Sequence, residues 1–295
     1  MSATPTVSIV TPSYNQGAYL EQTIRSVLAQ SYPRINYVVI DGGSTDESLS
    51  ILQRYGNRLA YWHSHRDSGL GEALAEGFRR CTGDIFAYLN SDDLLAPNAV
   101  EEAVRFLVSH PGVVLVYGDR VCIDDKGRLL YVRPSAPFGA RSPYLYMLLG
   151  QESCFWRRDA YWRAGGVNPE LRFAVDYDLF SRIAKIGPVT HCDRIWGFFR
   201  KHPSSKTMTS YASIGLGEVR TIQRAVWGAE IPRTCTCLIA TLYRLYAGGY
   251  GAYIERARWP GGVPKPPVAP WRTRVTSSLR HEHFLRRTAD RLLRR

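Results

Sequence analysis

The chain has 295 residues, of which 45% are hydrophobic, and it carries 38 basic against 26 acidic side chains. These values exclude a globally disordered chain and allow one large α/β domain, or one domain with an appendage. The six cysteines form no CxxC pair, so we expect reduced thiols rather than a disulfide framework or a zinc site. No apolar run reaches 18 residues and no basic-then-apolar leader is present, so we expect neither a membrane-spanning helix nor a secretory signal.

Short apolar runs alternate with segments of helical periodicity in the first third of the chain. The expected strands are 7–10, 37–40, 59–63 and 85–89, and the expected helices are 18–30, 47–54 and 70–80. Ser44 or Thr45 is the expected cap of the second helix, and Asp46 is read as a turn or capping residue. The alternation predicts an α/β fold with a doubly wound, mostly parallel sheet. Each strand ends in a polar cluster, and right-handed crossovers would bring these clusters to one ligand-binding edge.

The fourth expected strand runs directly into Asn90, Ser91, Asp92 and Asp93. Two adjacent carboxylates repel each other unless a cation or a donor compensates. Their position at a strand end therefore suggests a hard divalent metal together with a phosphate. The alternative is that Asp93 simply caps the next helix.

The middle of the chain has a less regular pattern. We expect helices at 99–108, 158–164 and 173–186, strands at 113–117, 152–156 and within 190–200, and a hairpin over 120–132 that turns at 124–127. The pair Gly165-Gly166 stops the second of these helices. Residues two apart on a helix point about 200° apart. Asp176 and Asp178 therefore cannot face one site together, and only one of them is a catalytic candidate.

The C-terminal region changes character after residue 210. Two helical stretches, 214–226 and 235–254, precede a Pro/Gly-rich linker at 259–271 and a basic helix candidate at 272–295. The last segment has the pattern of a peripheral anchor on an anionic membrane surface. A solvated helix packed on the catalytic domain is the alternative, and nucleic acid is the weakest reading because no recognised nucleic-acid module accompanies the charge.

Several of these clusters together resemble the inverting family 2 glycosyltransferases. The matching segments are VSIVTPSYNQGAYLEQTIRSVLAQSY, YVVIDGGSTDES, SHRDSGLGEALAEGFRRCTGDIFAYLNSDD, GGVNPELRFAVDYDLFSRI and FFRKHPSS. The resemblance implies the GT-A nucleotide-diphospho-sugar transferase fold over residues 1–205. Residues 1–110 would form its nucleotide-binding half and 111–205 its acceptor-binding half, followed by a helical, basic extension over 206–295.

The same resemblance assigns roles to individual residues. The nucleotide pocket would be lined by Pro12, Ser13, Tyr14, Asp41, Arg66, Asp67 and Ser91. Asp92 and Asp93 would form the motif that holds Mn²⁺ or Mg²⁺ on the donor diphosphate, and His202 would reach the metal or the diphosphate. Asp176 lies where the family places its catalytic base, and Gly165 and Gly166 would flank the acceptor site.

Each assignment has a plainer structural alternative. Asp176 could be a helix cap, Asp41 could hold a turn through its own side chain, and Arg66 and His202 could be surface residues. The chain also departs from the family pattern at three positions. Gly42 stands where many relatives have a second aspartate, Asn90 where many have a third carboxylate, and Ser68 where the nearest relatives usually have lysine.

The expected activity is transfer of one sugar from a nucleotide-diphospho-sugar to a hydroxyl of a glycan or lipid-linked acceptor. The Gln-x-x-Arg-Trp motif of processive synthases is absent, because residues 223–227 do not match it. Asp176 would deprotonate the acceptor while the metal neutralises the leaving diphosphate. A non-catalytic binding protein and a sugar nucleotidyltransferase are the alternatives. We expect a cytoplasmic enzyme, peripheral on the membrane.

Overall fold

A computed structural model describes residues 4–135, 149–232, 234–235, 237–238 and 241. The chain divides into a compact unit, Met1–Gly251, and a second unit, Ala252–Arg295. The second unit lies outside the described residues. The expected linker at 259–271, the expected basic helix at 272–295 and most of the expected helix at 235–254 therefore stay predictions.

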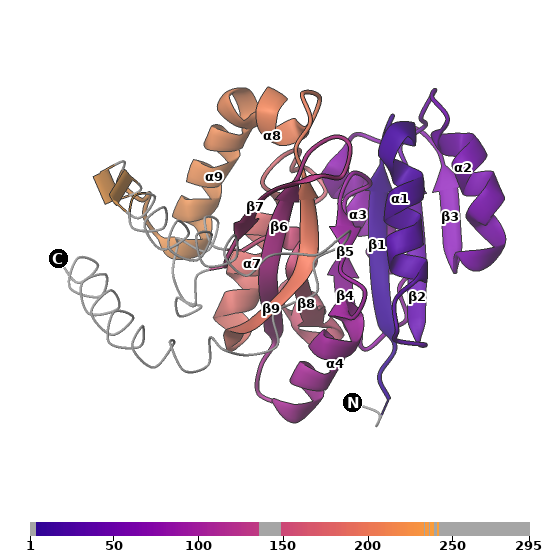
Figure 1. The fold of residues 1–295 in the computed structure, drawn as a ribbon. Coiled ribbons are helices and arrows are strands. Elements are labelled where there is room, and N and C mark those ends of the chain that lie inside the picture. The colour runs from indigo at the N-terminus through magenta and orange to yellow at the C-terminus, as the bar shows by residue number, and fades with distance from the viewer. Residues whose placement is uncertain (1–3, 136–148, 233, 236, 239–240, 242–295) are drawn as a thin grey trace. The chain divides into compact units, whose positions relative to one another are not determined.

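One mixed sheet forms the centre of the first unit, and nine of its strands lie in the described residues (Figure 1). The strands are β1 (Val7–Ser13), β2 (Ile35–Asp41), β3 (Tyr61–Ser64), β4 (Ile85–Tyr88), β5 (Leu94–Leu95), β6 (Leu115–Ile123), β7 (Leu129–Arg133), β8 (Cys154–Arg157) and β9 (Val189–Arg200). Their order is β3-β2-β1-β4-β8-β6-β9-β5, with β7 beside β6.

Short helices connect these strands. They are α1 (Gly17–Leu28), α2 (Ser48–Tyr55), α3 (Leu70–Arg79), α4 (Ala99–Ser109), α6 (Arg158–Arg163), α7 (Val175–Ile186), α8 (Lys206–Thr209) and α9 (Leu216–Ile222). Single 3₁₀ turns occur at η1 (Gly56–Arg58) and η2 (Gln151–Ser153), and π turns at η3 (Tyr211–Gly215) and η4 (Gln223–Trp227).

The strand directions confirm the doubly wound, mostly parallel prediction for the N-terminal half. β3, β2, β1 and β4 are all parallel, whereas β8 is antiparallel to both β4 and β6. The register places Ser13 beside Asp41 and Asp41 beside Ser64. Three strand ends therefore meet at one edge, and the backbone of Leu89 continues that line by donating to Val10.

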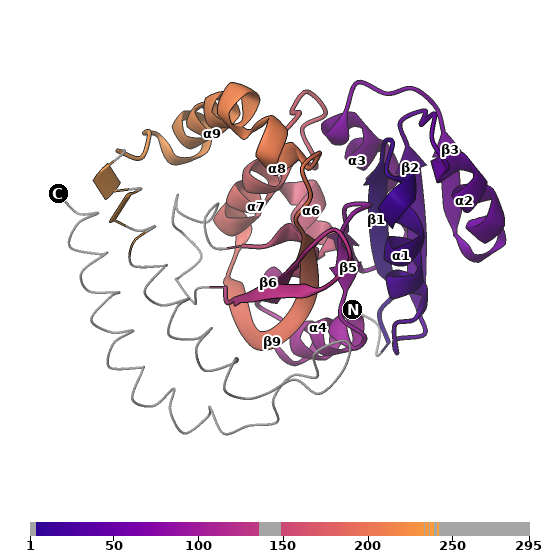
Figure 2. The ribbon, with the colours of Figure 1, turned by 45° about the horizontal axis from the view of Figure 1, so that its top comes forward.

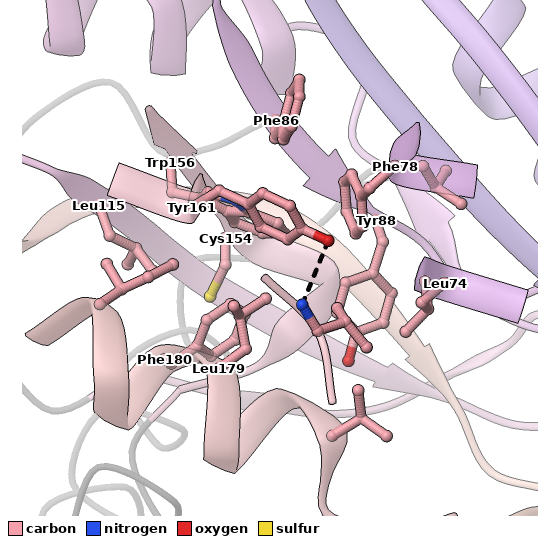
Figure 3. Close-up of a cluster of buried hydrophobic side chains, with 14 of the residues drawn as sticks. Leu74, Phe78, Phe86, Tyr88, Leu115, Cys154, Trp156, Tyr161, Leu179 and Phe180 are labelled. Carbon is pink, nitrogen blue, oxygen red and sulfur yellow. Dashed lines mark hydrogen bonds between the residues drawn. The ribbon is translucent and has the colours of Figure 1, made fainter. Parts of the chain in front are cut away.

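A large hydrophobic cluster lies where α3, α6 and α7 cover one face of the sheet (Figure 3). Phe78 of α3 contacts Phe86, Trp156 and Tyr161 with ring centroids 4.8–5.8 Å apart. Gly77 allows α3 to pack closely on β1, since a Cβ at position 77 would lie 2.4 Å from the side chain of Val10. Truncating a buried aromatic of this kind typically costs about 3–5 kcal/mol.

Several expected boundaries were wrong by a few residues, and one capping assignment was wrong in kind. Neither Ser44 nor Thr45 caps α2. Instead, Asp46 accepts hydrogen bonds from the backbone of Ser48 and of Gly17, so its carboxylate joins the starts of two helices. The interpretation of Asp93 as a helix cap is also wrong, because α4 begins only at Ala99.

Two further differences have a tertiary cause. The expected strand at 152–156 begins with η2, and the first strand residue is Cys154. The expected helix at 214–226 is a succession of π and α turns from Tyr211 to Trp227. It lies beside α7 (Figure 2). The contact is a small hydrophobic cluster that includes Tyr177, Val219 and Ile222. Among the described residues, no helix combines the length and the apolar character that crossing a bilayer requires.

Candidate active site

The polar turns after β1 and β2 are joined to each other at the ligand-binding edge of the sheet. Asn15 adopts a positive φ of 51°, and its backbone N–H donates to the hydroxyl of Ser44. The side-chain oxygen of Asn15 accepts a hydrogen bond from the backbone of Thr45. Between these turns Ser13 presents a buried hydroxyl without a hydrogen-bond partner among the described residues. Tyr14 beside it is 61% exposed, so this edge offers one unpaired hydroxyl and one free aromatic ring.

Asp41 ends β2 with a buried carboxylate that is already hydrogen-bonded. It accepts from the backbone and the hydroxyl of Ser44, at 2.9 and 2.6 Å, and from the hydroxyl of Ser64, at 2.7 Å. The side chain therefore stabilises the turn, which is the structural alternative to a ligand-binding role for Asp41. A carboxylate has about four acceptor sites, so three donors do not prevent a further contact with a ligand.

The turn after β3 lies against the turn after β2. The Asp67 carboxylate occupies the space beside Gly42, where a Cβ would lie 2.9 Å from its Oδ2. Its Oδ1 accepts from the backbone of Gly69, and burial raises the pKa of Asp67. The glycine that departs from the family pattern thus makes room for a carboxylate from another strand end. Arg66 is exposed at the same turn.

The Ser-Asp-Asp turn after β4 is held by the main chain and by α1. The hydroxyl of Thr23 donates to the carbonyl oxygens of both Ser91 and Asp93. The Asp93 carboxylate is fully enclosed and accepts from the backbone of Arg200, at 2.9 Å, and from the side chain of Gln151, at 3.0 Å. Burial, together with the neighbouring Asp92, raises the pKa of Asp93 well above its usual range.

Asp92 points differently from Asp93 and contacts His202. Its Oδ2 lies 2.9 Å from Nε2 of His202, and its side chain is 18% exposed. The His202 ring is buried, packs on Tyr19 with centroids 4.7 Å apart, and has its Nδ1 2.9 Å from the hydroxyl of Ser204. The two aspartates of the turn after β4 therefore have different environments. Asp93 is enclosed by the protein, whereas Asp92 is partly exposed at the edge of the sheet.

The donor set at Asp92 and His202 is compatible with a divalent cation. No group of three or more His, Cys, Asp or Glu side chains in the described part of the chain is arranged to hold a metal. Mg²⁺ and similar ions at phosphate sites, however, usually need only one or two carboxylates and take their other ligands from the phosphates and water. One carboxylate and one imidazole also suit Mn²⁺. The residues present therefore fit a metal that binds together with a diphosphate.

Asp176 lies in the first turn of α7, where the positive end of the helix dipole stabilises the negative charge of an acidic side chain. Burial raises the pKa of Asp176 to about 6, Glu152 adds to this effect, and Arg120 opposes it. Asp178 turns away to pair with Arg182. The two carboxylates therefore do not face one site together, and the catalytic role of Asp176 stays a prediction.

The start of α7 is fastened by a residue that sequence reasoning missed. Both oxygens of the Glu218 carboxylate accept backbone hydrogen bonds, from Arg172, Phe173 and Ala174, at 2.7–3.0 Å. These N–H groups precede the first full turn of the helix and would otherwise lack partners. Glu218 therefore orients the turn that carries Asp176, from a position 42 residues later.

Arg200 is a second residue to which the sequence analysis assigned no role, although it lies in the quoted segment FFRKHPSS. Its side chain is fully buried, and Nε donates to the carbonyl of Asp92 at 2.8 Å. Other guanidinium nitrogens reach the side chain of Gln22 and the carbonyls of Asp124 and Asp125. The planar group thereby connects α1, the turn after β4 and the β6–β7 hairpin.

Lys206, at the start of α8, is a third residue to which the sequence analysis assigned no role. Desolvation by the surrounding protein lowers the pKa of its ammonium group, while the carboxylates of Asp67, Asp92 and Glu218 oppose that shift. The lysine remains exposed to solvent. A cation near the carboxylates of two strand ends is available for an anionic ligand there.

Gly165 and Gly166 end α6 with positive φ values of 83° and 70°. The backbone of Gly166 donates to the carbonyl of Tyr161, whose hydroxyl accepts from the backbone of Val167 (Figure 3). The loop that follows meets the start of α3, where Gly71 donates to the carbonyl of Leu171. The two glycines thus direct a loop toward the helix that follows the Asp67 turn.

The sequence and the fold can be compared with known proteins. The family model described as "Glycosyl transferase family 2" matches residues 8–163, more than half of the chain. An uncharacterized glycosyltransferase of Rickettsia felis is 31% identical over 220 residues, which cover 70% of this chain and 36% of that protein. A chondroitin synthase of Escherichia coli is 30% identical over 193 residues, 65% of this chain and 28% of that protein. The chain thus spans about a third of the length of these relatives.

Two solved structures share the fold. S. aureus TarS, residues 1–349 in complex with UDP-GlcNAc, gives a TM-score of 0.62 at 19% identity and covers 78% of this chain and 68% of its own. A mannosyltransferase from Pyrobaculum calidifontis, in complex with GDP-Man and Mn²⁺, gives 0.58 at 19% identity, with 89% and 78% covered. The family match and the shared sheet agree with the sequence-based expectation. The chain belongs to glycosyl transferase family 2 and has the GT-A fold of these transferases.

Proposed function

We propose that this glycosyltransferase moves a single sugar from a nucleotide-diphospho-sugar to an acceptor hydroxyl by direct displacement, with inversion at the anomeric carbon. The observation that carries the proposal is the state of Asp176. It is a partly buried carboxylate with a pKa of about 6, free of any ion pair among the described contacts. It lies near the buried phenol of Tyr88, the last residue of β4, whose pKa both Asp176 and Asp93 help to raise.

In this proposal Asp176 accepts the proton of the acceptor hydroxyl. A pKa of about 6 leaves the carboxylate ionised at neutral pH and makes it a stronger base than a carboxylate in water. Glu218 holds the turn that carries Asp176, so little reorganisation is needed when the acceptor binds.

Asp92 and His202 are the residues proposed to hold Mn²⁺ or Mg²⁺. The ion would neutralise the charge that develops on the departing diphosphate. Asp93 would support the site from beneath, because both of its oxygens already accept hydrogen bonds from the protein. Lys206, at the start of α8, would place a second positive charge near the diphosphate.

The nucleotide is proposed to bind across the ends of β1, β2 and β3. Pro12, Ser13 and Tyr14 would contribute the unpaired hydroxyl and the exposed ring, Asp41 and Asp67 would offer acceptors, and Arg66 a donor. Ser91 would approach through the turn after β4. The TarS complex with UDP-GlcNAc and the mannosyltransferase complex with GDP-Man support this class of donor.

The acceptor is proposed to be a glycan or a lipid-linked glycan. It would enter beside the loop that Gly165 and Gly166 direct toward α3. This loop follows α6 and leads directly into the turn that carries Asp176, so an acceptor bound there would present its hydroxyl to the base.

The test begins with a thermal-shift screen of UDP-, GDP- and dTDP-sugars, each with and without Mn²⁺, followed by a donor-hydrolysis assay on the sugar nucleotide that stabilises the protein. Asp176→Asn should abolish turnover while leaving the donor-induced shift intact. Asp178→Asn makes the same chemical change two residues away and should retain activity, since Asp178 only pairs with Arg182. Full turnover by Asp176→Asn would refute the assignment of the base.

A further inference from the structure

The tip of the β6–β7 hairpin exposes a cluster of apolar residues. Leu129, Leu130 and Tyr131 are consecutive, and 46%, 47% and 42% of their surfaces are exposed. No other run of three consecutive large apolar residues in the described part of the chain is exposed to this extent. Neighbouring side chains of a strand point to opposite faces, so neither face of β7 is covered here. Consecutive exposed apolar side chains of this kind usually mark a contact surface.

Basic side chains surround this apolar cluster. Lys126 and Arg128 precede it in the exposed turn, and the ammonium group of Lys201 lies 5.1 Å from the ring centroid of Tyr131. The turn also contains two acidic residues. Asp124 is neutralised locally, since its carboxylate accepts from the backbone of Lys126 and from the backbone and guanidinium of Arg128. This ion pair also takes up the charge of Arg128, so Lys126 and Lys201 remain against Asp125 and the tip keeps an excess of one positive charge.

The size of the cluster argues against a second protein as its partner. A stable protein interface buries roughly 20–30 residues on each side. The exposed tip comprises residues 125–131, a narrow ribbon rather than a flat patch. Leucine and tyrosine at the apex of a narrow, basic hairpin suit insertion among lipid headgroups, where the rings and methyl groups enter the acyl boundary and the cations meet anionic phosphates.

We propose that the β6–β7 hairpin, through Leu129, Leu130 and Tyr131 flanked by Lys126 and Lys201, docks on an anionic lipid bilayer. The apolar side chains leave water at the headgroup boundary, and the cations neutralise anionic headgroups. This contact is separate from any contribution of the basic segment 272–295.

The hairpin is mechanically connected to the sugar-transfer site. The guanidinium of Arg200 reaches the carbonyls of Asp124 and Asp125 at 3.3 and 3.2 Å, while its Nε holds the carbonyl of Asp92 at 2.8 Å. One buried side chain, that of Arg200, therefore connects the hairpin turn at Asp124 and Asp125 to the turn at Asp92, where the metal is proposed to bind. Docking places the mouth of the site beside the bilayer, where a lipid-linked acceptor would present its hydroxyl. This consequence rests on the proposed function, whereas the lipid contact itself does not.

The test is co-sedimentation of the full chain with phosphatidylcholine vesicles containing 0 or about 30% phosphatidylglycerol, in the range of anionic surface charge that attracts basic segments. The unaltered chain should bind the anionic vesicles. Leu129→Ser/Leu130→Ser should lower the partition coefficient about tenfold, because two leucines no longer leave water. The control is Leu49→Ser/Val108→Ser, which removes two equally apolar side chains, 38% and 45% exposed, from α2 and α4. Its binding should match that of the unaltered chain.

Two further measurements locate the contact. Lys126→Glu should weaken binding to anionic vesicles and leave the small binding to neutral ones unchanged. Hydrogen exchange of residues 125–131 should slow when anionic vesicles are added. Equal partitioning of the hairpin variant and the control, or unchanged exchange at the tip, would overturn the proposal. A change from dimer to monomer in Leu129→Ser/Leu130→Ser without any lipid dependence would also overturn it, because the surface would then join two copies of the chain.

Discussion

Nε2 of His202 lies 2.9 Å from Oδ2 of Asp92, although 110 residues separate them in the chain. The contact joins the turn after β4 to the segment after β9, and Tyr19 of α1 closes the third side of the imidazole. A carboxylate that is partly open to solvent is thereby placed beside a ring whose other nitrogen is held by Ser204. Fixing the second nitrogen of a histidine orients the first, which is how proteins prepare imidazole ligands.

Replacing His202 should weaken metal-dependent donor binding. We expect His202→Ala to raise the Mn²⁺ concentration needed for half-maximal donor-induced thermal stabilisation about 10–100-fold, the usual effect of losing a metal-site partner. His110→Ala is the matched control, because His110 is exposed just after α4 and its ring contacts only its sequence neighbours Phe106 and Ser109 among the described residues. Identical Mn²⁺ titrations for the two variants would remove His202 from the proposed site.

Replacing Lys206 should lower the affinity for the nucleotide diphosphate. Lys206→Gln removes a cation whose charge interacts with those of Asp67 and Asp92, so we expect the Kd of the free nucleoside diphosphate to rise about tenfold. Calorimetric titration measures this directly. Lys185→Gln, on α7, serves as the control because its ammonium group packs on Trp227. If both variants bind the nucleotide as tightly as the unaltered chain does, Lys206 is only a surface charge.

The Asp176 carboxyl group should lower the free energy of unfolding at neutral pH relative to its contribution at low pH. Its pKa of about 6 in the folded protein lies above the ordinary aspartate value of 3.8, so its protonated form is favoured in the folded state. The resulting stability is present below pH 3.8 and is lost as the pH rises through 6. Asp176→Asn should therefore be more stable than the unaltered chain by about 1–2 kcal/mol at pH 7, allowing for screening at this partly exposed group.

Urea unfolding at pH 4 and pH 7 checks this prediction. The difference in free energy of unfolding between Asp176→Asn and the unaltered chain should be small at pH 4 and reach its full value above pH 6. A difference that does not change with pH would show that the carboxyl is not desolvated in the folded protein.

Glu152 should set the pH at which Asp176 becomes an active base. Its side chain is fully buried and 3.2 Å from Arg120, and its charge raises the pKa of Asp176. Glu152→Gln removes that charge, so the pKa of Asp176 should fall and the acid limb of the kcat/KM profile should move to lower pH. The exposed Glu47→Gln is the control. A limb that stays in place, or moves to higher pH, contradicts this role.

Arg200 should be required for both stability and the shape of the site. Arg200→Lys keeps a charge but loses the planar, buried group that serves four acceptors, and it leaves the carbonyls of Asp92, Asp124 and Asp125 without this donor. We expect a loss of about 3–5 kcal/mol in the free energy of unfolding, measured with urea. Arg194→Lys, on the exposed part of the same strand, should cost less than about 0.5 kcal/mol. A comparable small loss for Arg200→Lys would show that water replaces the guanidinium.

The local pattern of the chain was sufficient to predict the N-terminal half of the sheet and the place of the strand-end clusters. Apolar runs such as 37–40 and 85–89 are buried on both faces, and a parallel sheet must then bring their polar ends to one edge. The helical repeat likewise separated Asp176 from Asp178, because an angle of about 200° between side chains follows from helix geometry alone. The motifs at these same positions were sufficient to indicate the family.

Other features were decided only by the tertiary structure. β8 enters between β4 and β6 in the antiparallel direction, and no periodicity in residues 152–156 indicates that neighbour. Glu218, Arg200 and Lys206 have ordinary charged side chains in sequence, and their roles depend on backbone groups and carboxylates from distant segments. The free energy of such a contact depends on burial and on hydrogen-bond geometry, and both arise only after the sheet has assembled. The sequence by itself therefore determined the family and which groups are candidates for the chemistry, whereas the tertiary structure determined how they are held, paired and brought to the edge of the sheet.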